Sequence, residues 1–113
     1  MVYIKIDTST MTPIWVKGAT ITFANGEIYM TSVKADPSGN LIMAGTMTNP
    51  GTVNFGDGVT LSPETSGNGV AWIAKVSAAG VCQWATMYGG AGADDDTAGF
   101  NMGVDGSGNM YMG

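Results

Sequence analysis

The sequence contains no histidine, no arginine and only one cysteine, Cys82. Without histidine the chain cannot build a Ser-His-Asp or Cys-His catalytic arrangement. A lone cysteine allows neither an internal disulfide nor a thiolate metal cluster. The sequence therefore predicts no catalytic residue and no cofactor. A pair of carboxylates facing each other across a cleft stays open as a basis for hydrolysis.

Positive charge is also scarce, because four lysines stand against nine acidic residues and give a net charge of −5. Nucleic-acid-binding proteins neutralise phosphates with clustered Lys and Arg, so nucleic acid is a poor partner for this chain. No apolar run approaches the roughly 20 residues that a membrane-spanning helix needs. The N-terminal residues contain no basic segment followed by an apolar segment, so no signal peptide is visible in the sequence.

Glycine, by contrast, is abundant, with 18 in 113 residues, and 44% of the residues are hydrophobic. The glycines separate short segments rich in Val, Ile, Tyr, Trp and Met, a pattern typical of an all-β protein with many turns. The length predicts one domain over 1–113.

One short stretch occurs twice. "DPSGN" at 36–40 returns as "DGSGN" at 105–109, and Trp15 precedes the first by as many residues as Trp84 precedes the second. Asp and Asn side chains hydrogen-bond nearby backbone N–H groups, and Gly adopts positive φ without a steric penalty. The sequence therefore predicts the same hairpin turn in two places. The predicted turn residues are Asp36, Ser38, Gly39, Asn40, Asp105, Ser107, Gly108 and Asn109.

The similarity extends beyond the turns. "VYIKID" aligns with "WIAKVS" and brings Lys5 opposite Lys75, with a one-residue insertion or deletion before the tryptophan. The alignment predicts a repeat copy over 1–44, a second copy over 70–113 and an unmatched segment over 45–69. We expect both lysines on a solvent-facing or edge side of their strands, where lysine discourages edge pairing.

Each copy contains four segments with strand character. They are "MVYIKI", "IWVKGATITF", "IYMTSVKA" and "NLIMAGTM" in the first copy, and "VAWIAKVS", "VCQWATMYGG", "AGFNMGV" and "NMYMG" in the second. Four antiparallel strands form the blade of a β-propeller. The predicted fold is all-β, with β-propeller-type blades in about two four-stranded antiparallel sheets that are incomplete as a single ring.

Several stretches resemble the SBBP-type β-propeller repeat: "VKADPSGNLIMAGT", "VNFGDGVTLS", "VAWIAKVSAAGVCQWATMYGGAGADD" and "MGVDGSGNMYMG". That family shows an Asp-x-Ser-Gly-Asn turn before a strand, then a Phe-Gly element, an aromatic-x-x-Lys strand, a Trp and a Gly-Gly-x-Gly-x-Asp stretch. The resemblance covers most of 32–113, whereas "ATITFANGE" replaces the glycine-rich stretch in 1–31. It implies a propeller in an extracellular or cell-surface protein and no particular enzyme activity.

Two further groups of residues are candidates for binding. Asp94, Asp95 and Asp96 place three carboxylates together, but their spacing matches no calcium loop, so no metal site is predicted and these residues are only weak candidates. Trp72 and Tyr88 offer aromatic faces on which a sugar ring can stack, although such residues more often fill the space between sheets.

These features favour a non-enzymatic structural or adhesive repeat segment of a surface, filament or extracellular assembly. A carbohydrate-binding module is the alternative, and a glycan-active hydrolase fragment is a third hypothesis. Partners are expected to be other copies of the chain or further repeats of a longer parent chain, and glycans in the alternative. Strand "NMYMG" is expected to pair outside this unit or to lie at a frayed edge.

Overall fold

The computed structural model describes residues 1–22, 26–48, 51–62, 70–88 and 101–113. These residues form eleven β-strands and no helix, so the all-β prediction is confirmed. The strands are β1 (Val2–Asp7), β2 (Thr12–Gly18), β3 (Thr20–Ile21), β4 (Glu27–Ala35), β5 (Leu41–Thr48), β6 (Val53–Gly56), β7 (Val59–Leu61), β8 (Val70–Val76), β9 (Cys82–Tyr88), β10 (Met102–Val104) and β11 (Met110–Met112). No helix in these ranges is long and apolar enough to cross a bilayer.

The described strands pair antiparallel in four sheets. The largest, the central sheet, has the order β4-β5-β8-β9. A smaller sheet has the order β3-β6-β7, and β1-β2 and β10-β11 are separate hairpins. One sheet thus has the predicted four strands. It takes β4 and β5 from the first sequence copy and β8 and β9 from the second.

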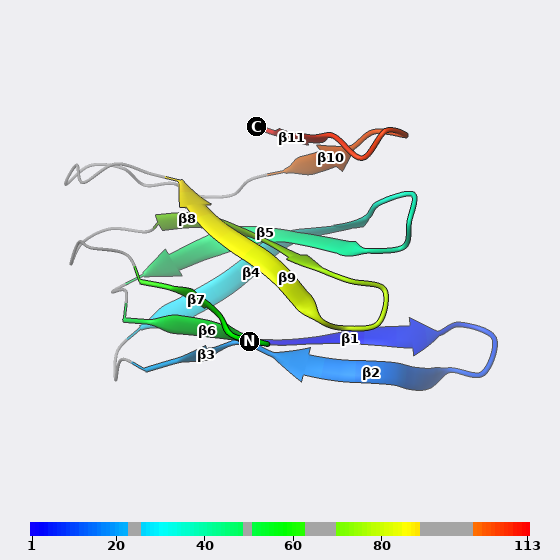
Figure 1. The fold of residues 1–113 in the computed structure, drawn as a ribbon, viewed down its shortest axis with the longest axis horizontal. Helices are drawn as coiled ribbons and strands as arrows, with labels where there is room; N and C mark the ends of the chain where they lie inside the picture. The colour runs from blue at the N-terminus through cyan, green and yellow to red at the C-terminus, as the bar shows by residue number, and fades with distance from the viewer. Residues whose placement is uncertain (23–25, 49–50, 63–69, 89–100) are drawn as a thin grey trace.

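The central sheet is covered on both faces (Figure 1). Because side chains alternate between the faces of a strand, β5 and β8 contribute to two separate cores. Met43 and Trp72 pack in one core with Tyr3 of β1 and Phe55 of β6. The second core lies on the opposite face, where Met102 of β10 covers a group formed by Ile42, Ala44 and Ile73. The result is three layers, with the β10-β11 hairpin on one side and β1-β2 with β3-β6-β7 on the other.

Trp72 is the largest side chain of the first core and is fully buried. Its ring lies 5.2 Å from that of Phe55, measured between centroids. The residue opposite Trp72 on β5 is Gly45. A side chain at Gly45 would collide with the carbonyl oxygen of Tyr29 on β4 and lie 2.9 Å from Trp72 Cζ2. Glycine at this position therefore allows β4, β5 and the indole ring to pack closely.

The four hairpin turns that join β1 to β2, β4 to β5, β8 to β9 and β10 to β11 lie at the same end of the molecule (Figure 1). This arrangement brings segments from both sequence copies together, and the candidate site lies here and along the neighbouring strand edges.

Candidate functional site

The turn at 36–40 is closed by the side chain of its first residue. Asp36 Oδ1 accepts hydrogen bonds from the backbone N–H groups of Ser38 and Asn40, each at 2.9 Å, and Asn40 Nδ2 donates to Asp36 Oδ2 at 2.8 Å. Gly39 has φ 76°, in the left-handed region that favours glycine. The local chemistry predicted from the sequence therefore accounts for this turn.

The turn at 105–109 has the same hydrogen bonds. Asp105 Oδ1 accepts from the N–H groups of Ser107 and Asn109, each at 2.9 Å, and Asn109 Nδ2 donates to Asp105 Oδ2 at 2.8 Å. Gly108 has φ 84°. The two turns differ in what contacts Oδ2 of the aspartate. The hydroxyl of Tyr111 donates to Asp105 Oδ2 at 3.1 Å, whereas Asp36 Oδ2 is contacted by Lys75.

A third turn of this kind joins β8 to β9 and was missed in the sequence analysis. The N–H of Ser77 donates to the carbonyl oxygen of Val81, and the N–H of Gly80 donates to that of Ser77, both at 2.8 Å. Ser77 Oγ accepts from the N–H of Val81 at 3.1 Å, and Gly80 has φ 87°. Serine thus replaces the aspartate. The available signal was a hydrogen-bonding first residue followed by glycine at the fourth position.

The hairpins β1-β2 and β8-β9 share one register. Lys5 pairs with Trp15, and Lys75 pairs with Trp84. Immediately after each lysine the register shifts by one residue, as in a β-bulge. The one-residue difference between the sequence copies lies in the turn, which is longer between β1 and β2. The two hairpins are therefore equivalent along their paired residues.

Lys75 does not lie at a sheet edge, and this corrects the edge position that was one of the two expected from the sequence. Strand β8 runs between β5 and β9, and Lys75 Nζ lies 2.9 Å from Asp36 Oδ2. The two side chains are 25% and 6% exposed, so this ion pair is shielded from water on the aspartate side. Lys5 does lie on an edge strand of the described residues, and its Nζ donates to the carbonyl oxygen of Ala78 at 3.2 Å.

Neighbouring turns contact one another through Ala78. The N–H of Ala78 donates to Asn40 Oδ1 at 3.2 Å, which joins the third turn to the first. The carbonyl oxygen of Ala78 accepts from Trp15 Nε1 at 3.1 Å in addition to Lys5. The lysine and tryptophan of one hairpin thus hold the turn of the next layer.

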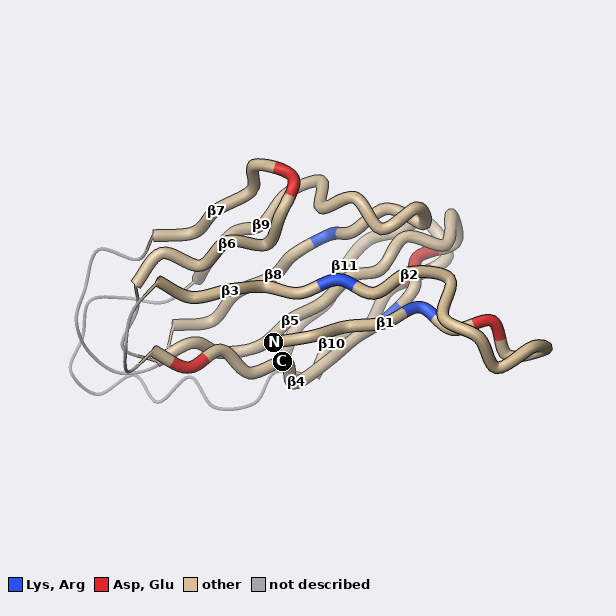
Figure 2. The backbone as a smooth tube through the Cα atoms, turned by 90° about the horizontal axis from the view of Figure 1, so that it is seen from below, with Lys and Arg blue, Asp and Glu red and all other residues tan. Residues whose placement is uncertain are grey.

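Both turn aspartates are held in the ionised form. Hydrogen bonding by Asn40, with Lys75 next in importance, lowers the pKa of Asp36 well below its usual range. Hydrogen bonds from Asn109 lower the pKa of Asp105 to about 2. Figure 2 shows that basic and acidic positions are spread singly along the described chain. The charges at the turns therefore act in specific pairs.

The aromatic candidates separate in the structure. Burial places Trp72 in the core, which corrects its assignment as a candidate for sugar stacking, because Phe55 and the strands around it occupy the ring's surroundings. Tyr88, at the end of β9, is 52% exposed. A surface depression of about 550 Å³ is lined by residues that include Glu27 and Tyr29, and by neither of the two candidates.

The metal candidates Asp94, Asp95 and Asp96 lie outside the described residues. Within the described ranges no group of three or more His, Cys, Asp or Glu residues is arranged to hold a metal ion.

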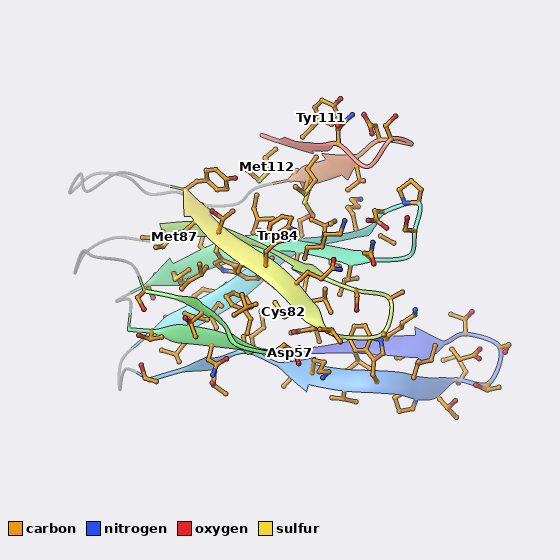
Figure 3. All side chains as sticks on the ribbon, viewed as in Figure 1. Asp57, Cys82, Trp84, Met87, Tyr111 and Met112 are labelled. Atoms are coloured by element: carbon orange, nitrogen blue, oxygen red, sulfur yellow. The ribbon has the colours of Figure 1, made fainter. Side chains whose placement is uncertain are left out.

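Strands β1 and β11 each have one unpaired edge in the described part of the chain, whereas their equivalents in the central sheet, β8 and β5, are paired on both sides. Strand β1 pairs only with β2, and β11 pairs only with β10. Side chains on these strands and on β2 include large exposed hydrophobics: Val2, Ile4, Ile6, Ile14, Val16, Met110, Tyr111 and Met112. Figure 3 shows Tyr111 directed away from the central sheet and Met112 directed toward it. The expected open edge at "NMYMG" is thus present among the described residues.

Comparisons with known proteins give no assignment, because no family model, no curated protein and no solved structure matches the chain.

Proposed function

We propose that this chain is a non-enzymatic structural or adhesive segment of a β-propeller-type assembly, of the kind the resemblance to SBBP repeats implies, at a cell surface, in a filament or in another extracellular structure. It works by stacking and pairing with other copies of itself or with further repeats. The observation that carries the proposal is the arrangement of one four-stranded sheet between two two-stranded hairpins, the half-sheets β1-β2 and β10-β11.

The half-sheets match the two halves of the central sheet. Hairpin β10-β11 has the aspartate turn of β4-β5. Hairpin β1-β2 has the lysine–tryptophan pair and the register shift of β8-β9. In the proposed assembly the central sheet forms one complete blade, β1-β2 forms the second half of the blade before it, and β10-β11 forms the first half of the blade after it. A propeller requires about 4–8 such blades, so the unit is completed by additional blades.

A structural role also agrees with the contacts of Asp36, which are made within the fold. The ionised Asp36 is bound by Asn40 and Lys75, and its hydrogen bonds close a turn and join two strands. A carbohydrate-binding role has less support. Of the two aromatic candidates for sugar stacking, Trp72 is buried and Tyr88 is exposed.

Sedimentation velocity over a wide concentration range tests the proposal. We expect the mass to rise with concentration in multiples of the 11.6 kDa chain. A compact 11.6 kDa monomer at every concentration would contradict it. A glycan array on the same preparation tests the alternative, for which specific binding lost on Tyr88→Ala is the supporting result.

A further inference from the structure

Strands β1 and β11 each have an unpaired edge, and the pairing of β5 with β8 inside the chain shows which kind of strand can pair with them. In the central sheet, β5 pairs with β8 so that Ile42 lies opposite Lys75. The same pairing places Lys75 Nζ 2.9 Å from Asp36 Oδ2. One strand thus supplies an aspartate turn and the other supplies its lysine.

Of the two unpaired edges, that of β11 has the aspartate turn and that of β1 has the lysine. Strand β11 follows the Asp105 turn as β5 follows the Asp36 turn, and it has no lysine partner in the described residues. Strand β1 corresponds to β8 and carries Lys5 at the position of Lys75. Each edge therefore carries one half of the interaction that joins β5 to β8, and the halves have opposite charge.

We propose that β11 of one copy pairs antiparallel with β1 of a second copy in the register Met110–Ile6, Tyr111–Lys5 and Met112–Ile4, with Lys5 bound to Asp105. This inference rests on the proposed assembly and specifies its contact. It joins the half-sheets into a four-stranded blade, β10-β11 from one copy and β1-β2 from the next. The occupant of both edges is a second copy of this chain.

The contacts of Lys5 and Lys75 support the pairing, because each of these equivalent lysines makes one of two compatible contacts. Lys75 binds the aspartate of its own sheet, and Lys5 binds the carbonyl oxygen of Ala78 in the neighbouring layer. An ammonium group has three donors, so one lysine can make both contacts. In the joined copies Lys5 makes both of them.

The tryptophans extend the same pattern. Trp15 donates its Nε1 to the carbonyl oxygen of Ala78. Its equivalent, Trp84, lies on the face of the central sheet that bears the β10-β11 hairpin (Figure 3). In the joined copies, Lys75 and Trp84 of the first copy reach the carbonyl oxygen of Thr8 in the turn of the second.

Burial of apolar side chains agrees with this arrangement. Val2, Ile4 and Ile6 are 65%, 50% and 48% exposed. Their equivalents on β8 are Trp72, Ala74 and Val76, and all three are 0% exposed because another layer covers them. Exposed contiguous apolar surface is characteristic of interaction sites. In the joined copies, this face of β1 packs on the central sheet of the first copy.

Charge removal tests the ion pair. Lys5→Met keeps the aliphatic stem, and Trp15 still donates to Ala78, so the fold is retained; urea unfolding of the variant checks this. We expect the association constant, measured by sedimentation, to fall about tenfold or more, as for loss of a hydrogen bond to a charged group. Lys34→Met is the control, because it removes the same charge from an exposed site on β4, and it should leave association within about twofold, as expected for a screened surface charge.

Engineered disulfides test the register. Directly opposed residues in an antiparallel pair have Cα atoms about 4.5–5.5 Å apart, within disulfide range. The variant with Ile6→Cys and Met110→Cys should therefore form covalent oligomers on mild oxidation with diamide. The control, Ile4→Cys with Met110→Cys, displaces one thiol by two residues, about 6.6 Å along the strand, and should form far fewer.

The outcomes separate the two proposals. Association that Lys5→Met weakens, together with the in-register disulfide, supports the pairing. Association that is insensitive to Lys5→Met, or disulfides that favour the Ile4 control, overturns this register while self-assembly stands. A monomer at all concentrations, with neither double-cysteine variant cross-linking, overturns both.

Discussion

Replacing Gly45 by alanine tests the close packing on which the central sheet depends. The new Cβ would overlap the carbonyl oxygen of Tyr29 and lie 2.9 Å from Trp72 Cζ2. Overpacking of a core typically costs about 1–3 kcal/mol, and the upper part of this range applies because a backbone carbonyl, unlike a flexible side-chain end, cannot move independently. Reduced freedom of the unfolded chain offsets about 0.4–1 kcal/mol. We expect a net loss of about 2 kcal/mol in the free energy of unfolding.

Urea unfolding followed by tryptophan fluorescence measures this loss, because Trp72 is fully buried beside the substituted residue. The midpoint should fall while the slope with urea stays unchanged. Gly103→Ala on β10 is the matched control, since a Cβ there meets nothing within 4 Å, and we expect a change within about 0.5 kcal/mol. Equal midpoints for wild type and Gly45→Ala, or equal losses in both variants, would refute the reasoning.

Other consequences concern the turns and the cysteine. Gly39→Val and Gly108→Val should each destabilise the fold by roughly 1–3 kcal/mol, because both glycines have positive φ; urea midpoints equal to wild type would contradict this. The lowered pKa values of Asp36 and Asp105 (about 2 for Asp105) mean that the unfolded chain binds protons first. Their stabilisation is therefore full above the unfolded pKa of about 3.9 and lost as the pH falls toward the folded values. Urea midpoints at about pH 6 and about pH 3 measure this loss, and Asp36→Asn should reduce it; an equal loss in that variant would count against the turn's role. Burial, then Asp57, raises the pKa of Cys82, so a thiol reagent should label the folded chain far more slowly than the unfolded chain, and equal rates would exclude a buried thiol.

The sequence by itself determined the features that depend on neighbouring residues. Its period-two segments and glycine-rich punctuation predicted an all-β chain. The Asp-x-Ser-Gly-Asn stretches predicted turns with Gly39 and Gly108 at the positions that the structure gives positive φ. These features are local because the hydrogen bonds that close each turn span at most four residues.

Only the tertiary structure decided which strands lie side by side. An alternation of apolar and polar residues predicts a strand with one buried and one exposed face. Both faces of β8 are covered, so its residues do not alternate between buried and exposed. The pairing of β5 with β8 joins the two sequence copies into one sheet, and it alone places Lys75 beside Asp36 and Trp72 over Gly45. Such contacts depend on segments that are far apart in the chain, and for that reason the sequence could suggest the lysine and the turn separately but could not join them.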